Sequence, residues 1–133
     1  MEREIKFRVW DKEKNVITGG DCLWLSLYDS TIARITEDCA YTEHYSYEDI
    51  GDRFILMQFT GLKDKNGKDI FEGDILTFYD NGNVYIVQYD EDNAEFNCGN
   101  EYDKPLAKQC EEGLEVIGNI YENSELLSKL NKE

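Results

Sequence analysis

The sequence predicts an α+β fold that is mainly β. Three features indicate it: segments in which apolar and polar residues alternate, an Asn-Gly pair between two β-rich runs, and one leucine stripe with helical spacing near the C-terminus. The 133 residues and a hydrophobic content of 41% suffice to form a core. We therefore expect a single domain over residues 1–133, with a division into subdomains 1–59 and 60–133 left open.

In the first half of the chain, two segments have the pattern of strands. Residues 5–11 alternate apolar and polar side chains, which predicts a half-buried strand, followed by a turn at residues 12–15. Residues 53–61 are so rich in apolar residues that a buried strand is expected there. Residues 22–28 fit either a strand or a short helix, with the strand preferred. Residues 29–52 are mixed and polar, and within them residues 41–52 predict a loop with a short helical turn.

The second half begins with the pattern of a β-hairpin. Asn81-Gly82 suits a two-residue type I′ turn, because both central positions of that turn need positive φ. The resulting register pairs Leu76 with Val87 and Phe78 with Tyr85, so that aromatic and branched side chains meet across the two strands.

Three shorter segments complete the second half. Residues 94–98 predict a further strand, and residues 114–122 a last strand that is broken or bulged at Gly118. A short C-terminal helix is expected next, capped by Asn123 or Ser124, with a stripe of Leu126, Leu127 and Leu130.

The segment "TGLKDKNGKDIFEGDIL", residues 60–76, contains a second Asn-Gly pair. A two-residue turn at this pair would place Lys65 opposite Lys68 and Asp64 opposite Asp69, and like charges in these positions are unfavourable. We therefore expect a longer and looser turn over residues 63–69, in which each lysine meets an aspartate diagonally.

Two glycines and one aspartate of this segment have expected backbone roles. Gly61 and Gly73 are predicted at positions that need unusual backbone angles or close packing. Asp74 is expected to accept hydrogen bonds from neighbouring backbone N–H groups and to fix the start of the next strand.

The net charge of −15 is unevenly distributed along the chain. Residues 1–66 carry 9 basic and 13 acidic side chains, whereas residues 67–133 carry 5 and 16, a net charge of −11. Direct binding to nucleic acid is disfavoured, because neutralising phosphates needs clustered lysines and arginines. Two interpretations of the acidic half stay open: a surface that keeps the protein soluble, and a surface that imitates nucleic acid and binds a host DNA- or RNA-binding protein.

The sequence holds no recognisable catalytic or metal-binding motif. His44 is the single histidine and is expected in a surface loop, and residues 90–93, "DEDN", lack the glycine of a calcium loop. We expect no catalytic residue, metal or cofactor, although a hydrolase that uses carboxylate-bound metal stays open as a weaker alternative. The four cysteines are Cys22, Cys39, Cys98 and Cys110, and no two of them have the spacing of a zinc or redox motif. We expect them to be reduced thiols, although the spacing alone would allow a Cys98–Cys110 disulfide.

Aromatic residues of the hairpin could serve more than one purpose. Phe78, Tyr79, Tyr85 and Tyr89 could stack on single-stranded nucleic acid, but the lack of nearby basic residues favours core positions or an oligomer interface. No stretch approaches the roughly 18 consecutive apolar residues of a membrane helix. The charged N-terminus has no apolar signal region, and we expect a mature cytoplasmic protein without a membrane contact.

Three segments, "EIKFRVWD", "MQFTGLKDKNGKDIFEGDIL" and "VIGNIYENSELL", resemble the YopX family of phage- and prophage-encoded bacterial proteins. The resemblance implies an α+β N-terminal part, a C-terminal part similar to an SH3-like barrel, and homo-oligomers, and it brings no established activity. It suggests a non-enzymatic accessory protein in the host cytoplasm that binds itself or a host or phage protein. Its central signature is expected to be structural, with Lys63, Asp64 and Lys65 exposed to a partner; the signature residues are Thr60, Gly61, Leu62, Lys63, Asp64, Asn66, Gly67, Gly73 and Asp74.

Overall fold

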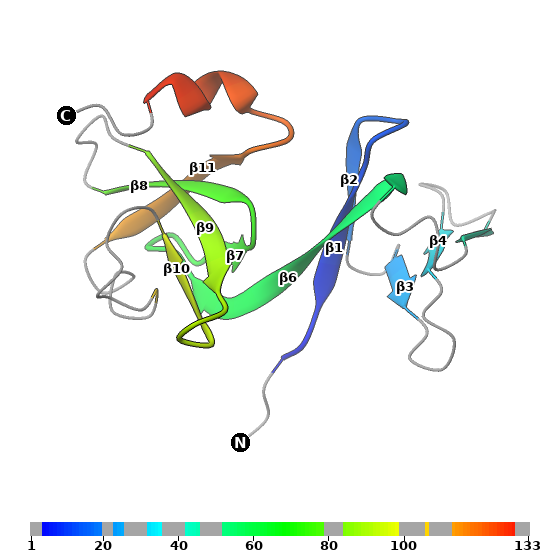
Figure 1. Cartoon of the computed structure of the whole chain (residues 1–133), viewed down its shortest axis with the longest axis horizontal. Coiled ribbons are helices and arrows are strands. Elements are labelled where there is room, and N and C mark those ends of the chain that lie inside the picture. The colour runs from blue at the N-terminus through cyan, green and yellow to red at the C-terminus, as the bar shows by residue number, and fades with distance from the viewer. Residues whose placement is uncertain are drawn as a thin grey trace. The chain divides into compact units, whose positions relative to one another are not determined.

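The computed structural model divides the chain into two compact units (Figure 1). The N-terminal unit is Ile5–Gln58, and the C-terminal unit is Phe59–Glu133 together with Met1–Glu4. The described residues are 4–19, 23–25, 32–35, 42–45, 52–78, 84–98, 106 and 113–129. They form strands and turns almost throughout, so the mainly β prediction is confirmed, whereas the N-terminal helical part and the SH3-like barrel are not. Within these residues, no helix has the length and apolar character needed to cross a membrane.

The N-terminal unit contains the predicted strand at its start. Strand β1 (Phe7–Asp11) lies between β2 (Val16–Gly19) and the beginning of β6 (Phe54–Lys63) and is antiparallel to both. The turn expected at residues 12–15 joins β1 to β2. Apolar side chains from β1 and β6 are buried, namely Val9, Trp10, Phe54 and Met57.

The same unit contains a second sheet, one strand of which lies where a loop was expected. Strands β3 (Leu23–Leu25), β4 (Ile32–Ile35) and β5 (Thr42–Tyr45) form an antiparallel sheet in that order. The strand prediction for residues 22–28 is confirmed over β3, and the loop prediction for residues 41–52 is wrong over β5. Strand β4 lies in the mixed polar segment for which no element was predicted. His44 lies in β5 opposite Ala33, not in a loop. Both strands are short and mix polar with apolar residues, so their pairing decides the structure and local alternation does not reveal it.

Strand β6 confirms the strand expected at residues 53–61, but it is only partly buried. Phe54, Met57 and Phe59 are buried, whereas Leu56 remains 37% exposed. The strand predicted from the long apolar run is therefore correct, but its predicted burial is too high.

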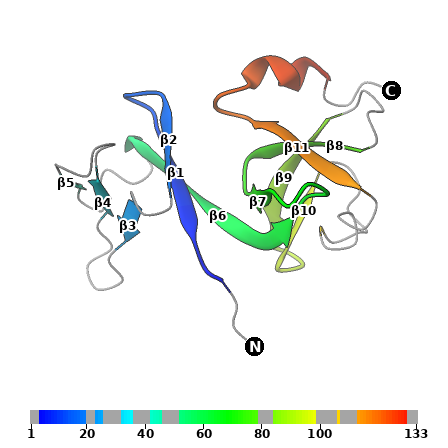
Figure 2. The same ribbon diagram turned by 180° about the vertical axis from the view of Figure 1, so that it is seen from behind.

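In the described residues, the C-terminal unit is built from the end of β6 and five further strands (Figures 1 and 2). A four-stranded antiparallel sheet has the order β10-β9-β8-β11, and the end of β6 pairs with β7. Seen from behind in Figure 2, β11 lies alongside β8. The strands are β7 (Asp69–Phe71), β8 (Asp74–Phe78), β9 (Tyr85–Asp90), β10 (Glu95–Cys98) and β11 (Leu114–Asn119).

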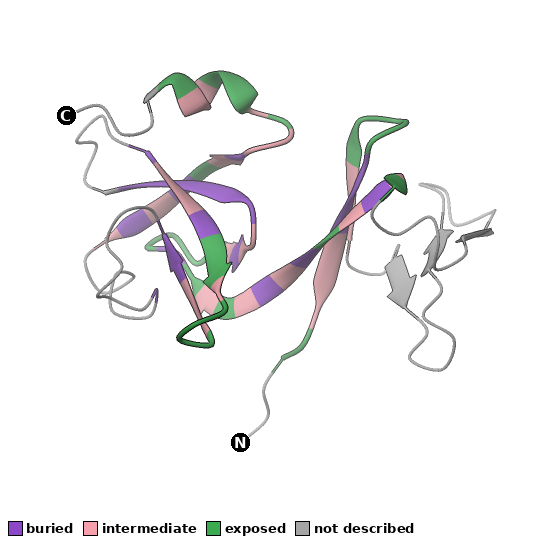
Figure 3. Cartoon of the chain, in the orientation of Figure 1, coloured by how far each residue is buried: buried purple, intermediate pink, exposed green. Residues whose placement is uncertain are grey.

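One buried cluster forms the core of this unit, and Figure 3 colours the buried segments of its strands purple. Leu62, Tyr85 and Phe96 pack against this core from its margin. Cys98 lies inside it, fully buried, while the other three cysteines and the pairing of Cys110 lie outside the described residues. The buried members are Ile70, Leu76, Val87, Cys98, Leu106, Leu114 and Val116.

The register expected for the β8–β9 hairpin is wrong by two residues. Leu76 lies opposite Tyr85, where Val87 was expected. Val87 instead lies beside Gly73, because the backbone N–H of Gly73 donates to the Val87 carbonyl at 3.0 Å. A shift of two residues leaves every side chain on the same face, so the apolar pattern cannot distinguish the two registers. The Asn81-Gly82 turn itself lies outside the described residues.

The last elements agree more closely with expectation. Strand β10 confirms the strand at residues 94–98, and β11 changes register between Val116 and Gly118, as the bulge prediction required. The C-terminal helix is a 3₁₀ helix, Ser124–Lys129. Asn123 occupies the predicted position at the start of the helix, where its carbonyl accepts the N–H of Leu126 at 2.9 Å. Its side chain does not cap the helix, because it accepts from the backbone N–H of Asn119 at 3.1 Å.

Candidate functional site

The loop between β6 and β7 is longer than a two-residue turn, as the charge argument predicted. Lys63 and Asp69 face each other at its base, and the Lys63 Nζ lies 2.6 Å from the Asp69 Oδ1. The loop is not loose, because the N–H of Asp64 donates to the Lys68 carbonyl at 2.8 Å and the N–H of Gly67 donates to the Asp64 carbonyl at 3.0 Å. Gly67 permits this closure with a φ of 84°.

Asp64 occupies the centre of the loop and is buried, with 7% exposure, so its expected exposure is wrong. One carboxylate oxygen accepts the backbone N–H groups of Asn66 at 2.8 Å and Lys68 at 2.9 Å. The other accepts the N–H of Val116 at 2.9 Å, from strand β11 and 52 residues away in sequence. This carboxylate therefore shapes its own loop and joins the loop to β11.

The surroundings of Asp64 favour its charged form. Burial raises the pKa of this carboxyl, but hydrogen bonds from the N–H groups of Val116, Lys68 and Asn66, with the charge of Lys68, outweigh burial. The pKa of Asp64 is therefore lowered from its usual value of 3.8.

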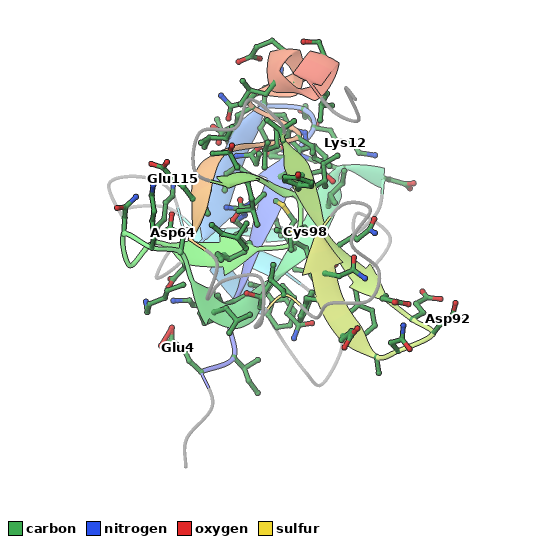
Figure 4. The ribbon with its side chains drawn as sticks, turned by 90° about the vertical axis from the view of Figure 1, so that its left-hand side faces the viewer. Glu4, Lys12, Asp64, Asp92, Cys98 and Glu115 are labelled. Atoms are coloured by element: carbon green, nitrogen blue, oxygen red, sulfur yellow. The ribbon has the colours of Figure 1, made fainter. Side chains whose placement is uncertain are left out.

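A second set of contacts joins the loop to β11 at the surface. The backbone N–H of Lys65 donates to the Leu114 carbonyl at 3.0 Å, and the Lys65 Nζ lies 3.6 Å from a Glu115 carboxylate oxygen. The Asn66 side chain donates to the other Glu115 oxygen at 3.4 Å. Figure 4 shows Asp64 and Glu115 on the same side of the unit. Lys65 thus pairs with a glutamate of another strand, and the expected diagonal pairing with an aspartate is wrong for this lysine.

The residues before the loop form an irregular part of β6. The register between β6 and β7 shifts between Phe59 and Lys63, and Gly61 lies within this shift with a φ of 87°, as predicted. The Thr60 hydroxyl donates to the Ile70 carbonyl at 2.8 Å and accepts from the Leu62 N–H at 3.2 Å. Thr60 therefore supplies polar contacts where the strand pairing is interrupted.

Gly73 and Asp74 have the backbone roles expected of them. Gly73 has a φ of 84°, and its carbonyl accepts the N–H of Ile120 at 3.0 Å. Asp74 is 1% exposed, and one carboxylate oxygen accepts the N–H of Phe71 at 2.8 Å. Both residues fix the tight connection from β7 to β8.

Comparison with known proteins identifies the origin of this signature. A family model described as YopX protein matches residues 6–128. The chain belongs to the YopX family. The crystal structure of protein EF1440 from Enterococcus faecalis is similar, with 28% identity, a TM-score of 0.65, and coverage of 95% of this chain and 99% of that one.

A second YopX structure supports the same fold. Protein yopX from Bacillus subtilis has 23% identity and a TM-score of 0.60, and the match covers 92% of this chain and 95% of that one. A search of curated proteins found no match. The YopX family is uncharacterised, so membership brings a fold and no activity.

The most buried polar groups of the YopX signature stabilise the fold. The Asp64 carboxylate is buried and accepts three backbone hydrogen bonds, which leaves it little capacity to act as a base or a metal ligand. Lys63 and Lys65 carry their charges at the surface in ion pairs, with side-chain exposures of 61% and 40%. Among the described residues, no three His, Cys, Asp or Glu side chains are grouped closely enough to hold a metal ion.

Sequence reasoning missed one buried ion pair of this YopX protein, in the N-terminal unit. Asp11 is fully buried, and its two oxygens accept from Arg53 at 3.0 and 3.1 Å and from the N–H groups of Glu13 and Lys14. Burial raises the pKa of Asp11, but these hydrogen bonds outweigh it and lower that pKa. The partners are 42 residues apart, and no local pattern connects them.

The acidic segment at residues 90–93 is the turn of the β9–β10 hairpin. The Asp90 carboxylate accepts the backbone N–H groups of Asp92 at 3.0 Å and Asn93 at 3.4 Å, and the Asn93 side chain at 2.7 Å. The hydrogen bond from the Asn93 side chain is the largest influence on the pKa of Asp90, which is lowered. The carboxylate thus organises an Asx-type turn.

Proposed function

We propose that this chain is a non-enzymatic phage or prophage accessory protein that acts by binding protein, in the cytoplasm of its bacterial host. The observation that carries the proposal is the use of the signature carboxylates within the fold. Asp64 and Asp74 are buried and bonded to backbone N–H groups. Because these carboxylates stabilise the backbone, the signature supports a structural role in a binding protein more than a catalytic role.

The proposal includes self-association and an SH3-like arrangement of the C-terminal strands. The short antiparallel strands that curl around one core are compatible with such a barrel. Lys63, Lys65 and Asn66 are the signature side chains that present polar groups to a partner, because Asp64 lies beneath them.

The test is an affinity pull-down of the tagged chain from host lysate, combined with sedimentation of the purified protein. We expect one host or phage protein to be retained, or the bait itself to be recovered as a multimer. A monomer that retains no protein at any salt concentration would contradict the proposal. Turnover of a substrate by the purified chain would also contradict it.

A second candidate function is imitation of nucleic acid, which the net charge of −11 in residues 67–133 favours. A mimic would retain a nucleic-acid-binding protein at low salt and lose it as salt screens the charges. Retention that is unchanged at high salt would contradict mimicry and leave the first proposal standing. The metal-dependent hydrolase gains no support from the described carboxylates, and a lack of thermal stabilisation by Mn²⁺ or Mg²⁺ would count against it.

A further inference from the structure

An aromatic pair lies at the outer end of the β9–β10 hairpin. Tyr89 is opposite Phe96, and their rings meet edge to face with centroids 5.2 Å apart. Strand alternation places Tyr89 on the same face as Val87, which is in the core. Phe96 packs against that core, whereas Tyr89 is 47% exposed. The apolar face of the hairpin thus continues past the core into solvent.

The turn beyond this pair is acidic and lacks an internal counter-charge. Residues 84–98 contain Asp90, Glu91, Asp92 and Glu95, and no lysine, arginine or histidine. Within the described part of the chain, the side chains of Glu91, Asp92 and Glu95 make no ion pair. Figure 3 shows the end of the hairpin as exposed, and Figure 4 places Asp92 at its tip.

Three other acidic residues of the same unit are used differently. Asp69 is paired with Lys63 and Glu115 with Lys65, while Asp64 accepts backbone hydrogen bonds. The hairpin therefore combines an exposed ring with carboxylates that the described residues leave without a cation.

We propose that this surface, defined by Tyr89, Glu91, Asp92 and Phe96, binds an arginine-bearing segment of a partner protein. An arginine side chain fits both parts, because its planar guanidinium stacks on an aromatic face and pairs with carboxylates. Nucleic acid does not fit, because the carboxylates repel phosphate. The inference rests on the proposed protein-binding function and names the chemistry of the partner.

The test uses the full-length chain and a fluorescein-labelled hexa-arginine peptide, with binding followed by fluorescence anisotropy at about 0.15 M salt. Replacing Tyr89 with leucine removes the ring at constant charge, and Tyr89→Phe keeps the ring. We expect Tyr89→Leu to weaken binding about threefold, the size of an exposed cation–π contact, and Tyr89→Phe to bind nearly as the wild type does. Because Tyr89 is largely exposed, thermal melting should show that both variants remain folded.

A pair of double variants separates the local surface from net charge. Glu91→Gln with Asp92→Asn removes two charges from the hairpin, and Asp52→Asn with Glu125→Gln removes two from exposed positions elsewhere. We expect the hairpin variant to weaken peptide binding at least threefold more than the control does, since exposed ion pairs act locally. Equal weakening by the two double variants, or equal affinity of wild type and Tyr89→Leu, would overturn the proposal.

Two further outcomes are distinguished by sedimentation and by the pull-down. If Tyr89→Leu dissociates a multimer without changing peptide affinity, the surface joins copies of this chain, and the proposal of an arginine partner is wrong. The pull-down can also recover a partner equally well with the wild type and with Tyr89→Leu, while the affinity for the peptide is the same for both. In that case this inference fails and the proposed protein-binding function stands.

Discussion

At the scale of single residues, burial decides how much an aspartate contributes to the fold. Asp64 is buried and receives three backbone hydrogen bonds, whereas Asp69 pairs with the exposed ammonium group of Lys63. Hydrogen bonds to a charged group contribute about 1.5–3 kcal/mol each, and an exposed ion pair contributes about 0–1 kcal/mol. We therefore expect the two residues to respond very differently to loss of charge.

Replacing Asp64 with asparagine should destabilise the protein by about 2–3 kcal/mol. The amide can keep one accepting oxygen for the loop, but its NH₂ group then faces the N–H of Val116, and two donors cannot bond. Urea unfolding at neutral pH measures the loss. Asp69→Asn is the matched control and should change the free energy of unfolding by less than about 1 kcal/mol. Equal effects of the two substitutions would contradict a special role for Asp64.

The contribution of Asp64 should also depend on pH in a definite direction. Because the folded pKa is lowered below 3.8, its stabilisation is complete above 3.8 and is lost as the pH falls through 3.8 towards the folded value. The difference in unfolding free energy between wild type and Asp64→Asn should therefore be constant between about pH 7 and pH 5 and narrow at lower pH. A difference that widens on acidification would show that the charged form is not the stabilising one.

Ala94 offers a prediction of opposite sign. It has a φ of 53° in the β9–β10 turn, a left-handed conformation that an alanine side chain disfavours. Ala94→Gly should stabilise the protein by about 0.5–1 kcal/mol, the strain relief being partly offset by the greater freedom of glycine in the unfolded chain. Asn15, with a φ of 55°, is the control, because asparagine tolerates this region, and Asn15→Gly should have little effect. Denaturant midpoints would decide, and a loss of stability in Ala94→Gly would refute the strain argument.

At the scale of elements, the end of β11 depends on the absence of a side chain at Gly118. A Cβ atom built there would overlap the Asn123 Oδ1, and that oxygen accepts the N–H of Asn119. Asn119 in turn accepts the N–H groups of Tyr121 and Glu122 at 3.0 and 2.8 Å. The tight turn after β11 is therefore built around the space that the glycine leaves.

Gly118→Ala should destabilise the protein by about 1–3 kcal/mol, because the Asn123 side chain must move and lose its hydrogen bond. Asn123→Ala removes that bond directly, and the double variant should lose less than the sum of the two single losses, since both act on one contact. Thermal and urea unfolding of the three variants test this. Strict additivity would mean that the glycine and Asn123 are independent.

The same scale shows which elements the sequence could predict. Alternation and apolar runs located β1, β6, β10 and the bulged β11, because those segments carry the signal of their own burial. They did not locate β4 and β5, whose pairing decides their structure, or the β8–β9 register, in which a shift of two residues preserves each face.

In the candidate site too, the sequence predicted the local features and not the long-range contacts. Local reasoning predicted the longer turn, the backbone angles at Gly61 and Gly73, and the hydrogen bonding of Asp74. It did not reveal that Asp64 is buried or that Asp11 binds Arg53, because those contacts reach across 52 and 42 residues. Long-range contacts of this kind leave no periodic signal in the neighbouring sequence.

At the scale of the whole molecule, the net charge of −15 opposes the compact state through repulsion among carboxylates. Salt screens this repulsion, and it also weakens attractive exposed pairs such as Lys63 with Asp69. Exposed pairs of this kind, such as Lys63 with Asp69 and Lys65 with Glu115, contribute at most about 1 kcal/mol each. Screening of repulsion should therefore dominate.

Raising NaCl from about 0.1 to 1 M shortens the screening length from roughly 10 to 3 Å and should stabilise the protein. We expect a gain of about 1 kcal/mol, equivalent to a rise in melting temperature of about 4 °C. The double variant Asp52→Asn with Glu125→Gln carries two fewer negative charges, so its melting temperature should rise less over the same series. A melting temperature that falls with salt would mean that the ion pairs, Asp11 with Arg53 foremost, contribute more than the repulsion removes. The acidic surface would then be balanced within the fold, and charge alone would no longer argue for a cationic partner.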